Sequence, residues 1–227
     1  MTRTRFALVV FAASAAGVAL QSDVSNVLSS TALAGKQAND TYLVASAQLV
    51  KPWLLKTRIP GRPADLAIHP SGAFAAVLNG TSVVTIDLTS GREISRVPTK
   101  TTSYIGIAFR PNSDELWASE ATRNGPDALL RIPHAKDGTL GKLDRIELPG
   151  HPIPAGLAFN KDGSKLYAAL HHTNEIITFN PATKQITARW PSNLAPFSLA
   201  LNDKGTVLYV SNRGGAPNAT AQQAPSG

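Results

Sequence analysis

The stretch that decides the fold runs from Pro196 to Asn212 and reads PFSLALNDKGTVLYVSN. Two runs of mostly apolar and small residues, 196–201 and 207–212, flank the turn residues Asp203-Lys204-Gly205. Short apolar runs that contain branched and aromatic side chains, separated by an Asp-x-Gly turn, are typical of a β-hairpin. The stretch therefore predicts two antiparallel strands joined by a tight turn.

The same pattern occurs three more times toward the N-terminus. Residues 63–79, 106–120 and 154–170 each combine a short apolar run, a turn rich in Pro, Asn, Asp, Ser or Gly, and a second apolar run. An apolar anchor stands in the first run of every copy, and successive anchors are 41, 50 and 42 residues apart: Leu66, Ile107, Leu157 and Leu199. Self-similarity at a period of about 40–45 residues indicates a repeat architecture.

Each of the first three copies continues into two further strand-like runs. These runs occupy 83–86 and 93–97, 129–132 and 143–148, and 176–179 and 185–190. Four short strands per repeat are the signature of one blade of a β-propeller. The sequence therefore predicts an all-β, incomplete β-propeller of four-stranded antiparallel blades, with about four to five blades present. A β-sandwich with internal similarity is the alternative.

An alanine follows the anchor in all four copies. Small side chains are expected where blades converge on a central axis, because neighbouring sheets can then approach one another closely. The larger apolar residue after each alanine is expected to fill the space between blades. The four alanines are Ala67, Ala108, Ala158 and Ala200.

These columns resemble the YVTN-type β-propeller repeat, in which an apolar-Ala-apolar triplet is followed by Asp-Gly and then by an apolar-Tyr-Val-small-Asn strand. The segment 208–212 (LYVSN) is the best match within the chain. The segments 61–67 (GRPADLA) and 211–215 (SNRGG) further resemble exported, YncE-like proteins, in which a propeller precedes an alkaline-phosphatase-family phosphoesterase domain. The resemblance covers residues 58–216. It implies the propeller and not the hydrolase, because no room for a phosphoesterase domain remains.

The N-terminus has the features of an export signal. Arg3 and Arg5 precede an apolar or small run at 6–20 (FALVVFAASAAGVAL), which is short for a membrane span. Ala32-Leu33-Ala34 fits the small-x-small cleavage rule, so residues 1–34 are expected to form a signal peptide. An earlier cut and an uncleaved anchor are the alternatives. A periplasmic or secreted location follows, with no stable membrane span beyond this signal.

The remainder is expected to divide into three parts. Residues 35–60 form a leading segment that supplies outer strands of a first blade, residues 61–215 hold three complete blades and one half-blade, and residues 216–227 form a disordered or truncated tail. Propellers typically have about 4–8 blades, so the chain is expected to be a fragment of a longer protein. Self-association through open strand edges is the alternative.

Composition restricts the chemistry. The chain contains no cysteine, which excludes disulfides, thiolate metal sites and a cysteine nucleophile. The formal net charge is +7, but the cations are scattered, so nucleic-acid binding is not expected. No Gly-x-Ser-x-Gly elbow, phosphate-binding glycine loop or distinctive Ser-His-Asp spacing is present. The adjacent Asp114 and Glu115 are expected in a solvated turn, and no cofactor is predicted.

Propeller ligands often sit at one rim. Alternate loops of an antiparallel blade share a face, so the loop before the first strand and the loop after the second strand are expected at the same rim. Ten polar residues near these loops are candidate ligand-binding residues: Arg62, Asp65, Asn79, Glu120, Arg123, His151, His171, His172, Asn212 and Arg213.

The rim side chains could bind a metal ion, bind an anion, or simply face solvent. The three histidines suit a metal site, but the adjacent His171 and His172 point to opposite sides of an extended strand, so no metal is expected. The three arginines could hold an anion through forked hydrogen bonds, although surface arginines also cover apolar neighbours with their stems.

The sequence thus indicates an exported β-propeller repeat module, a fragment of a longer protein, that is a scaffold for a small molecule or a protein. No chemistry of its own is expected. A hydrolase of lactonase or phosphoesterase type, acting at the propeller rim or through a missing C-terminal domain, is the alternative.

Overall fold

The computed structural model describes residues 34–37, 41–44, 48–51 and 57–214, and every regular element within these ranges is a β-strand. The chain divides into two compact units, Met1–Lys56 and Thr57–Gly227. No helix in the described ranges is long and apolar enough to cross a membrane. The expected signal peptide, apart from Ala34, and the expected tail at 216–227 lie outside the described residues.

The first unit contains a small antiparallel sheet. Its strands, in spatial order, are β1 (Gly35–Lys36), β2 (Tyr42–Leu43) and β3 (Leu49–Val50). The assignment of these strands to a leading blade stays a prediction.

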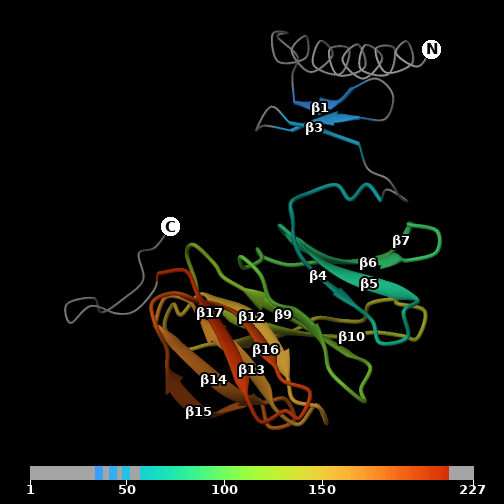
Figure 1. Cartoon of the computed structure of the whole chain (residues 1–227). Helices are drawn as coiled ribbons and strands as arrows, with labels where there is room; N and C mark the ends of the chain where they lie inside the picture. The colour runs from blue at the N-terminus through green and yellow to red at the C-terminus, as the bar shows by residue number, and fades with distance from the viewer. Residues whose placement is uncertain (1–33, 38–40, 45–47, 52–56, 215–227) are drawn as a thin grey trace, which may run out of the picture. The chain divides into compact units, whose positions relative to one another are not determined.

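The second unit contains three four-stranded sheets and one two-stranded sheet (Figure 1). The first sheet has β4 (Pro63–Ile68), β5 (Phe74–Asn79), β6 (Ser82–Asp87) and β7 (Glu93–Pro98). The second has β8 (Ile107–Phe109), β9 (Glu115–Glu120), β10 (Ala128–Pro133) and β11 (Asp144–Glu147). The third has β12 (Pro154–Phe159), β13 (Leu166–Leu170), β14 (Glu175–Asn180) and β15 (Gln185–Pro191). The last has β16 (Pro196–Leu201) and β17 (Leu208–Asn212).

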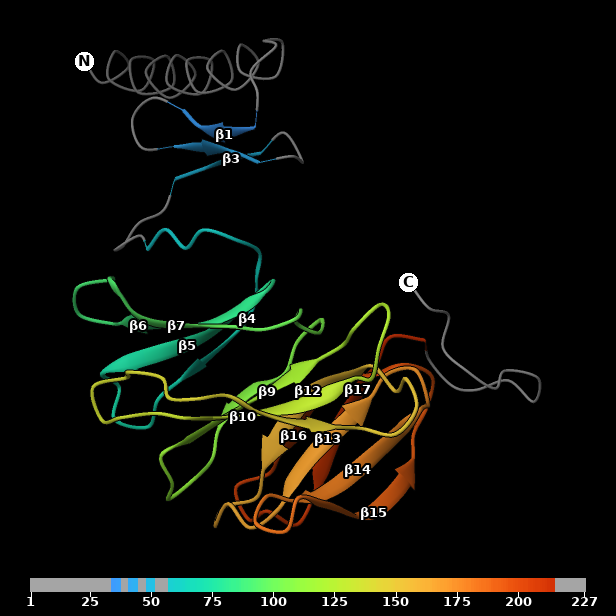
Figure 2. The same cartoon turned by 180° about the vertical axis from the view of Figure 1, so that it is seen from behind.

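The four sheets are arranged radially. The first strands of successive sheets contact one another in the order β4, β8, β12 and β16, while β7, β11 and β15 end their sheets on the far side. Figure 2 shows β7 and β15 on opposite flanks of this unit, with β12 and β16 between them. This arrangement confirms the predicted partial β-propeller and not the β-sandwich.

Apolar side chains fill the space between successive sheets, because strand residues alternate between two faces. In β9, Leu116 and Ala118 pack with the first sheet, whereas Trp117 packs with the third sheet beside Phe179. The carboxylate of Glu115 at the start of β9 is also buried, so the expectation of a solvated turn is wrong for Glu115, although Asp114 is exposed. A strand covered on both faces needs an uninterrupted buried run, and β5 and β9 are buried along their whole length.

The close approach expected at the alanine column is found two residues earlier, at glycines. A Cβ atom on Gly156 would lie 2.5 Å from the backbone oxygen of Phe197 in the last sheet. A Cβ atom on Gly106 would overlap the backbone carbonyl of Ala155 in the third sheet. Ala108 and Ala158 lie at the same interfaces but are only partly buried. The absence of a side chain at the two glycines therefore sets the spacing of the sheets.

Candidate functional site

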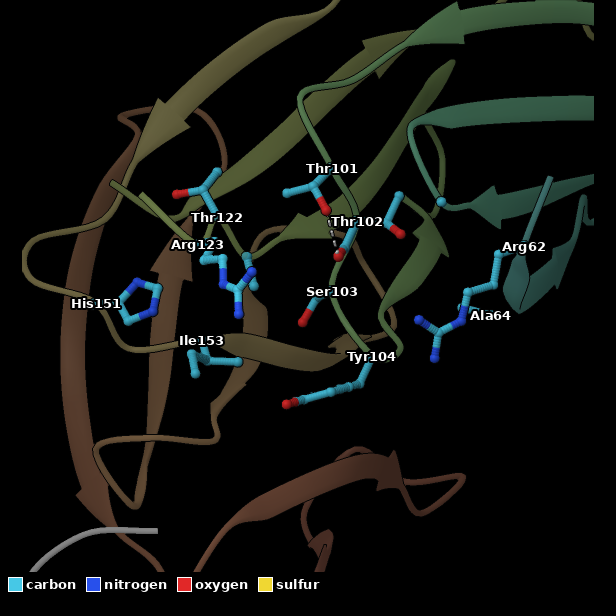
Figure 3. A pocket seen from close by; sticks show the side chains of 12 residues that line it. Arg62, Ala64, Thr101, Thr102, Ser103, Tyr104, Thr122, Arg123, His151 and Ile153 are labelled. Carbon is cyan, nitrogen blue, oxygen red and sulfur yellow. Dashed lines mark hydrogen bonds between the residues drawn. The ribbon is translucent and has the colours of Figure 1, made fainter. Parts of the chain in front are cut away.

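A pocket of about 750 Å³ opens at the rim where the first three sheets meet (Figure 3). Its walls come from the start of β4, the β5–β6 turn, the segment before β8, the segment after β9 and the loop before β12. The lining residues are Arg62, Ala64, Gly80, Thr101, Thr102, Ser103, Tyr104, Ala121, Thr122, Arg123, His151 and Ile153.

The repeat explains why the second sheet supplies most of the wall. In the other three copies a proline stands three residues before the anchor and pairs with the end of the second strand: Pro63, Pro154 and Pro196. A β-bulge follows each of these pairs. Tyr104 takes this place in the second copy, and β8 begins only at Ile107. The preceding residues 101–104 lie outside the described strands and run along the pocket, while the backbone N–H of Ser103 donates to the carbonyl oxygen of Ser119 in β9 at 3.2 Å.

Residues 101–104 form a segment of four hydroxyl side chains, Thr-Thr-Ser-Tyr. Ser103 is only 6% exposed, and its Oγ is buried with no hydrogen-bond partner in the described structure. The hydroxyl of Thr101 donates to the carbonyl oxygen of Thr102 at 3.3 Å. Sequence reasoning missed this segment, although four successive hydroxyl residues in place of a rim proline are a usable signal.

Glu120 shapes the pocket from behind. Its side chain is 1% exposed and forms an ion pair with Arg145. Its Oε1 accepts hydrogen bonds from the backbone N–H of Lys100 at 3.0 Å and of Thr101 at 3.5 Å. Because both carboxylate oxygens are occupied, Glu120 holds the hydroxyl segment in place and does not face the pocket.

Asp127 performs the same task for the opposite wall, and sequence reasoning missed it. Its side chain is fully buried, Oδ1 accepts the backbone N–H of Thr122 at 2.8 Å, and Oδ2 accepts that of Ile153 at 2.7 Å. The Nδ1 atom of His151 lies 3.2 Å from Oδ1. No local pattern separates Asp127 from exposed turn acids such as Asp137, because two of its partners, His151 and Ile153, lie in the distant loop before β12.

The open surface of the pocket is cationic. Arg62 and Arg123 are exposed, and no Asp or Glu is among the lining residues. Figure 3 shows the two guanidinium groups on opposite sides of Ser103 and Tyr104. His151 lies beside Arg123, and its backbone oxygen is 2.9 Å from Nδ1 of His172. The structure thus brings together three of the ten sequence candidates: Arg62, Arg123 and His151.

Three other candidates make structural hydrogen bonds within or between the sheets. Asp65 in β4 accepts the backbone N–H of Gly106 at 2.8 Å and so ties the first sheet to the second. Asn79 is buried and donates to the carbonyl oxygen of Pro60 at 2.9 Å. Asn212 accepts a hydrogen bond from the hydroxyl of Ser192 at 3.0 Å.

His171 and Arg213 lie behind Tyr104. The guanidinium of Arg213 stacks 4.6 Å from the ring centre of Phe197 and 5.7 Å from that of Tyr104. Burial lowers the pKa of His171, and Arg213 adds to this effect, while a contact with the carbonyl oxygen of Pro196 opposes it. His171 is therefore neutral at pH 7, and in the described ranges no three His, Asp or Glu side chains converge as a metal site requires.

Comparisons with known proteins bear on the fold. No protein-family model matches the sequence, and no curated protein sequence matches it. Among solved structures the chain is similar to a functionally unknown protein from Desulfotomaculum acetoxidans, with a TM-score of 0.58 and 19% identity over 66% of this chain and 49% of that one. It is also similar to hydrazine synthase from Kuenenia stuttgartiensis, with a TM-score of 0.58 and 16% identity over 76% of this chain and 61% of that one.

A third similar structure is the β-propeller domain of Cps50 (Swd1) from Myceliophteria thermophila, with a TM-score of 0.57 and 16% identity. That alignment covers 78% of this chain and 60% of the propeller domain. The chain therefore spans between about half and three fifths of the length of these structures. At such low identities the similarity shows the β-propeller fold alone.

Proposed function

We propose that this chain is an exported, YVTN-type and YncE-like β-propeller module that binds a ligand at the rim pocket and performs no chemistry of its own. The observation that carries the proposal is the pocket at the junction of three sheets, with polar and charged groups on its walls. Propellers commonly bind ligands where blade loops converge. The YVTN likeness rests on the repeat columns, above all on residues 208–212.

The pocket is pre-organised, which favours binding. The buried carboxylates of Glu120 and Asp127 hold backbone N–H groups of both walls. Because these hydrogen bonds fix the loops before a ligand arrives, little conformational entropy remains to be lost on binding.

The same geometry argues against hydrolysis at this rim. Asp127 and His151 form a carboxylate–imidazole pair, which could orient a general base. Two buried hydroxyl residues line the pocket: the Oγ of Ser103 has no hydrogen-bond partner in the described structure, and the hydroxyl of Thr122 donates to the carbonyl oxygen of Gly125. A serine without a hydrogen-bonded base is not an activated nucleophile.

The binding role is tested by filling the pocket. Ala64→Trp places an indole at the pocket wall, and Ala135→Trp places the same group on an exposed turn elsewhere. In a thermal-shift screen of metabolites and short peptides, we expect at least one ligand to raise the Tm of the native chain and of Ala135→Trp but not of Ala64→Trp. Ligand binding that survives Ala64→Trp, or turnover of an ester, lactone or phosphate that Ala64→Trp abolishes, contradicts the proposal.

Export is tested separately. Residues 1–34 fused to a reporter enzyme that is active only outside the cytoplasm should give activity in a bacterial host. Replacing Arg3 and Arg5 by glutamate should lower the exported fraction. A fusion that accumulates in the cytoplasmic fraction and gives no reporter activity contradicts export.

A further inference from the structure

The charge of the rim pocket selects for anions. Its lining side chains include Arg62 and Arg123 but no carboxylate. The two acids behind the walls do not cancel this charge toward the ligand. Glu120 is paired with Arg145, and the fully buried Asp127 is directed at two backbone N–H groups and His151. A concave surface with cations of one sign attracts anionic ligands.

The placement of the arginines selects for two separate anionic groups. A guanidinium presents a planar fork that matches one carboxylate through two parallel hydrogen bonds. Arg62 and Arg123 approach from opposite sides of the pocket, with Ser103 and Tyr104 between them (Figure 3). Two forks on opposite walls fit a ligand with a carboxylate at each end better than a single compact phosphate.

The floor between the arginines selects for hydroxyl groups. Ser103 is 94% buried, and its Oγ lacks a partner in the described structure. A buried hydroxyl without a hydrogen bond is unfavourable, so a ligand that supplies the missing partner gains affinity. The hydroxyls of Thr101 and Tyr104 line the same pocket.

We infer that the pocket takes a hydroxylated dicarboxylate, an organic acid with carboxylates at both ends and hydroxyls between them. Arg62 and Arg123 each bind one carboxylate, and Ser103 hydrogen-bonds to a ligand hydroxyl. The inference deepens the proposed function and rests on it.

A series of four-carbon probes separates these contributions in isothermal titration calorimetry. Tartrate carries two carboxylates and two hydroxyls, succinate only the carboxylates, and threitol only hydroxyls. We expect tartrate to bind about tenfold tighter than succinate and threitol to bind weakest. Arg62→Gln and Arg123→Gln should each weaken tartrate about tenfold, whereas the exposed Arg92→Gln, on a turn outside the pocket, should not.

The Ser103→Ala variant tests the hydroxyl contact by itself. It should weaken tartrate and leave succinate unchanged, so that the two dicarboxylates bind alike. Equal weakening of both would show a structural effect and overturn the assignment of Ser103.

The remaining outcomes separate the inference from the proposed function. No binding of tartrate at about 10 mM, or tighter binding of threitol or inorganic phosphate than of tartrate, overturns the dicarboxylate inference. In those cases the proposed function stands if another ligand is still lost in Ala64→Trp. Tartrate binding that is unchanged in Ala64→Trp places the site elsewhere and overturns both.

Discussion

At the scale of single residues, Glu115 shows how a buried charge is stabilised in the second sheet. Its carboxylate lies 3.0 Å from Arg110 and 2.5 Å from Arg131, and it accepts a hydrogen bond from the indole N–H of Trp117 at 3.1 Å. Burial by itself would raise the pKa of Glu115, but hydrogen bonds from Arg131, Arg110 and Trp117 outweigh it and hold the pKa below the usual 4.5. The charged form is thus the stable one in the folded chain.

Glu115→Gln should destabilise the protein at pH 7 by about 2 kcal/mol, because two partly buried arginines lose their counter-charge. Since the folded-state pKa lies below the unfolded value, the contribution is present above pH 4.5 and is lost as the pH falls through the folded pKa. The difference between native chain and variant should therefore shrink toward about pH 3 in urea unfolding.

The control for this experiment is Glu93→Gln, which removes an exposed partner of Arg96. A surface pair of this kind should cost no more than about 0.5 kcal/mol. A Glu115→Gln difference that stays constant with pH would refute the charge argument.

His171 predicts acid sensitivity of the same sign as Glu115 but at higher pH. Its pKa is lowered by burial and Arg213, so the unfolded chain binds a proton before the folded chain does. Stability is then complete above the unfolded value of 6.5 and falls as the pH drops below it. The loss between about pH 7 and 5 should be smaller in His171→Gln, measured by thermal unfolding at each pH.

Some acid sensitivity should remain in that variant. The pKa of His69 is also lowered, by burial and by the neighbouring His134. An identical pH slope in His171→Gln and the native chain would show that folding does not lower the pKa of His171.

At the scale of elements, the inner strands depend on glycines that admit the next sheet. Gly156→Ala should cost about 2–3 kcal/mol, since the new Cβ would meet the backbone of Phe197 and Ser198 and the sheets would have to separate. Gly205→Ala is the matched control: its φ is +69° and nothing lies within 4 Å, so only backbone strain of about 1–2 kcal/mol remains. Denaturant unfolding of both variants checks this, and a smaller cost for Gly156→Ala would show that the sheets yield easily.

The sequence predicted the strands well because their signals are local. The predicted run 83–86 lies within β6 and 176–179 within β14, each bounded by turn residues. The buried position of Glu115 was missed because its arginine partners stand 5 and 16 residues away and cannot be seen in a local pattern.

The residues of the candidate site also divide into those that were predicted from the sequence and those that were missed. Arg62, Arg123 and His151 were predicted at the rim from loop parity alone, and they line the pocket; their part in binding stays a prediction. Asp127 was missed because it acts on Ile153, 26 residues away. Ser103 was missed because the alignment of the second copy began at its apolar run, after the hydroxyl segment.

At the scale of the whole molecule, the second unit is a row of sheets whose main contacts run in chain order. Sheets in the middle of the row are covered on both faces, as the buried β9 shows. The last sheet is different: Leu199 and Val210 pack on the third sheet, while Tyr209 on the other face is 61% exposed. In the described part of the chain β17 pairs with β16 alone.

Local unfolding of this row should begin at the last sheet, which has two strands, β16 and β17. Amide hydrogens of β16 and β17 should exchange at least about tenfold faster than those of β9 and β13, because local opening of the last sheet uncovers one interface rather than two.

Leu166→Ala in the third sheet should cost about 2–5 kcal/mol and accelerate exchange throughout the row, since Leu166 is fully buried between sheets. Leu208→Ala should accelerate exchange in β16 and β17 alone, because it loosens a sheet that already opens by itself. Hydrogen exchange followed by mass spectrometry of peptides measures both. Equal protection of β17 and β13 would mean that the last sheet is held from both sides, either by a further strand or by a second copy of the chain.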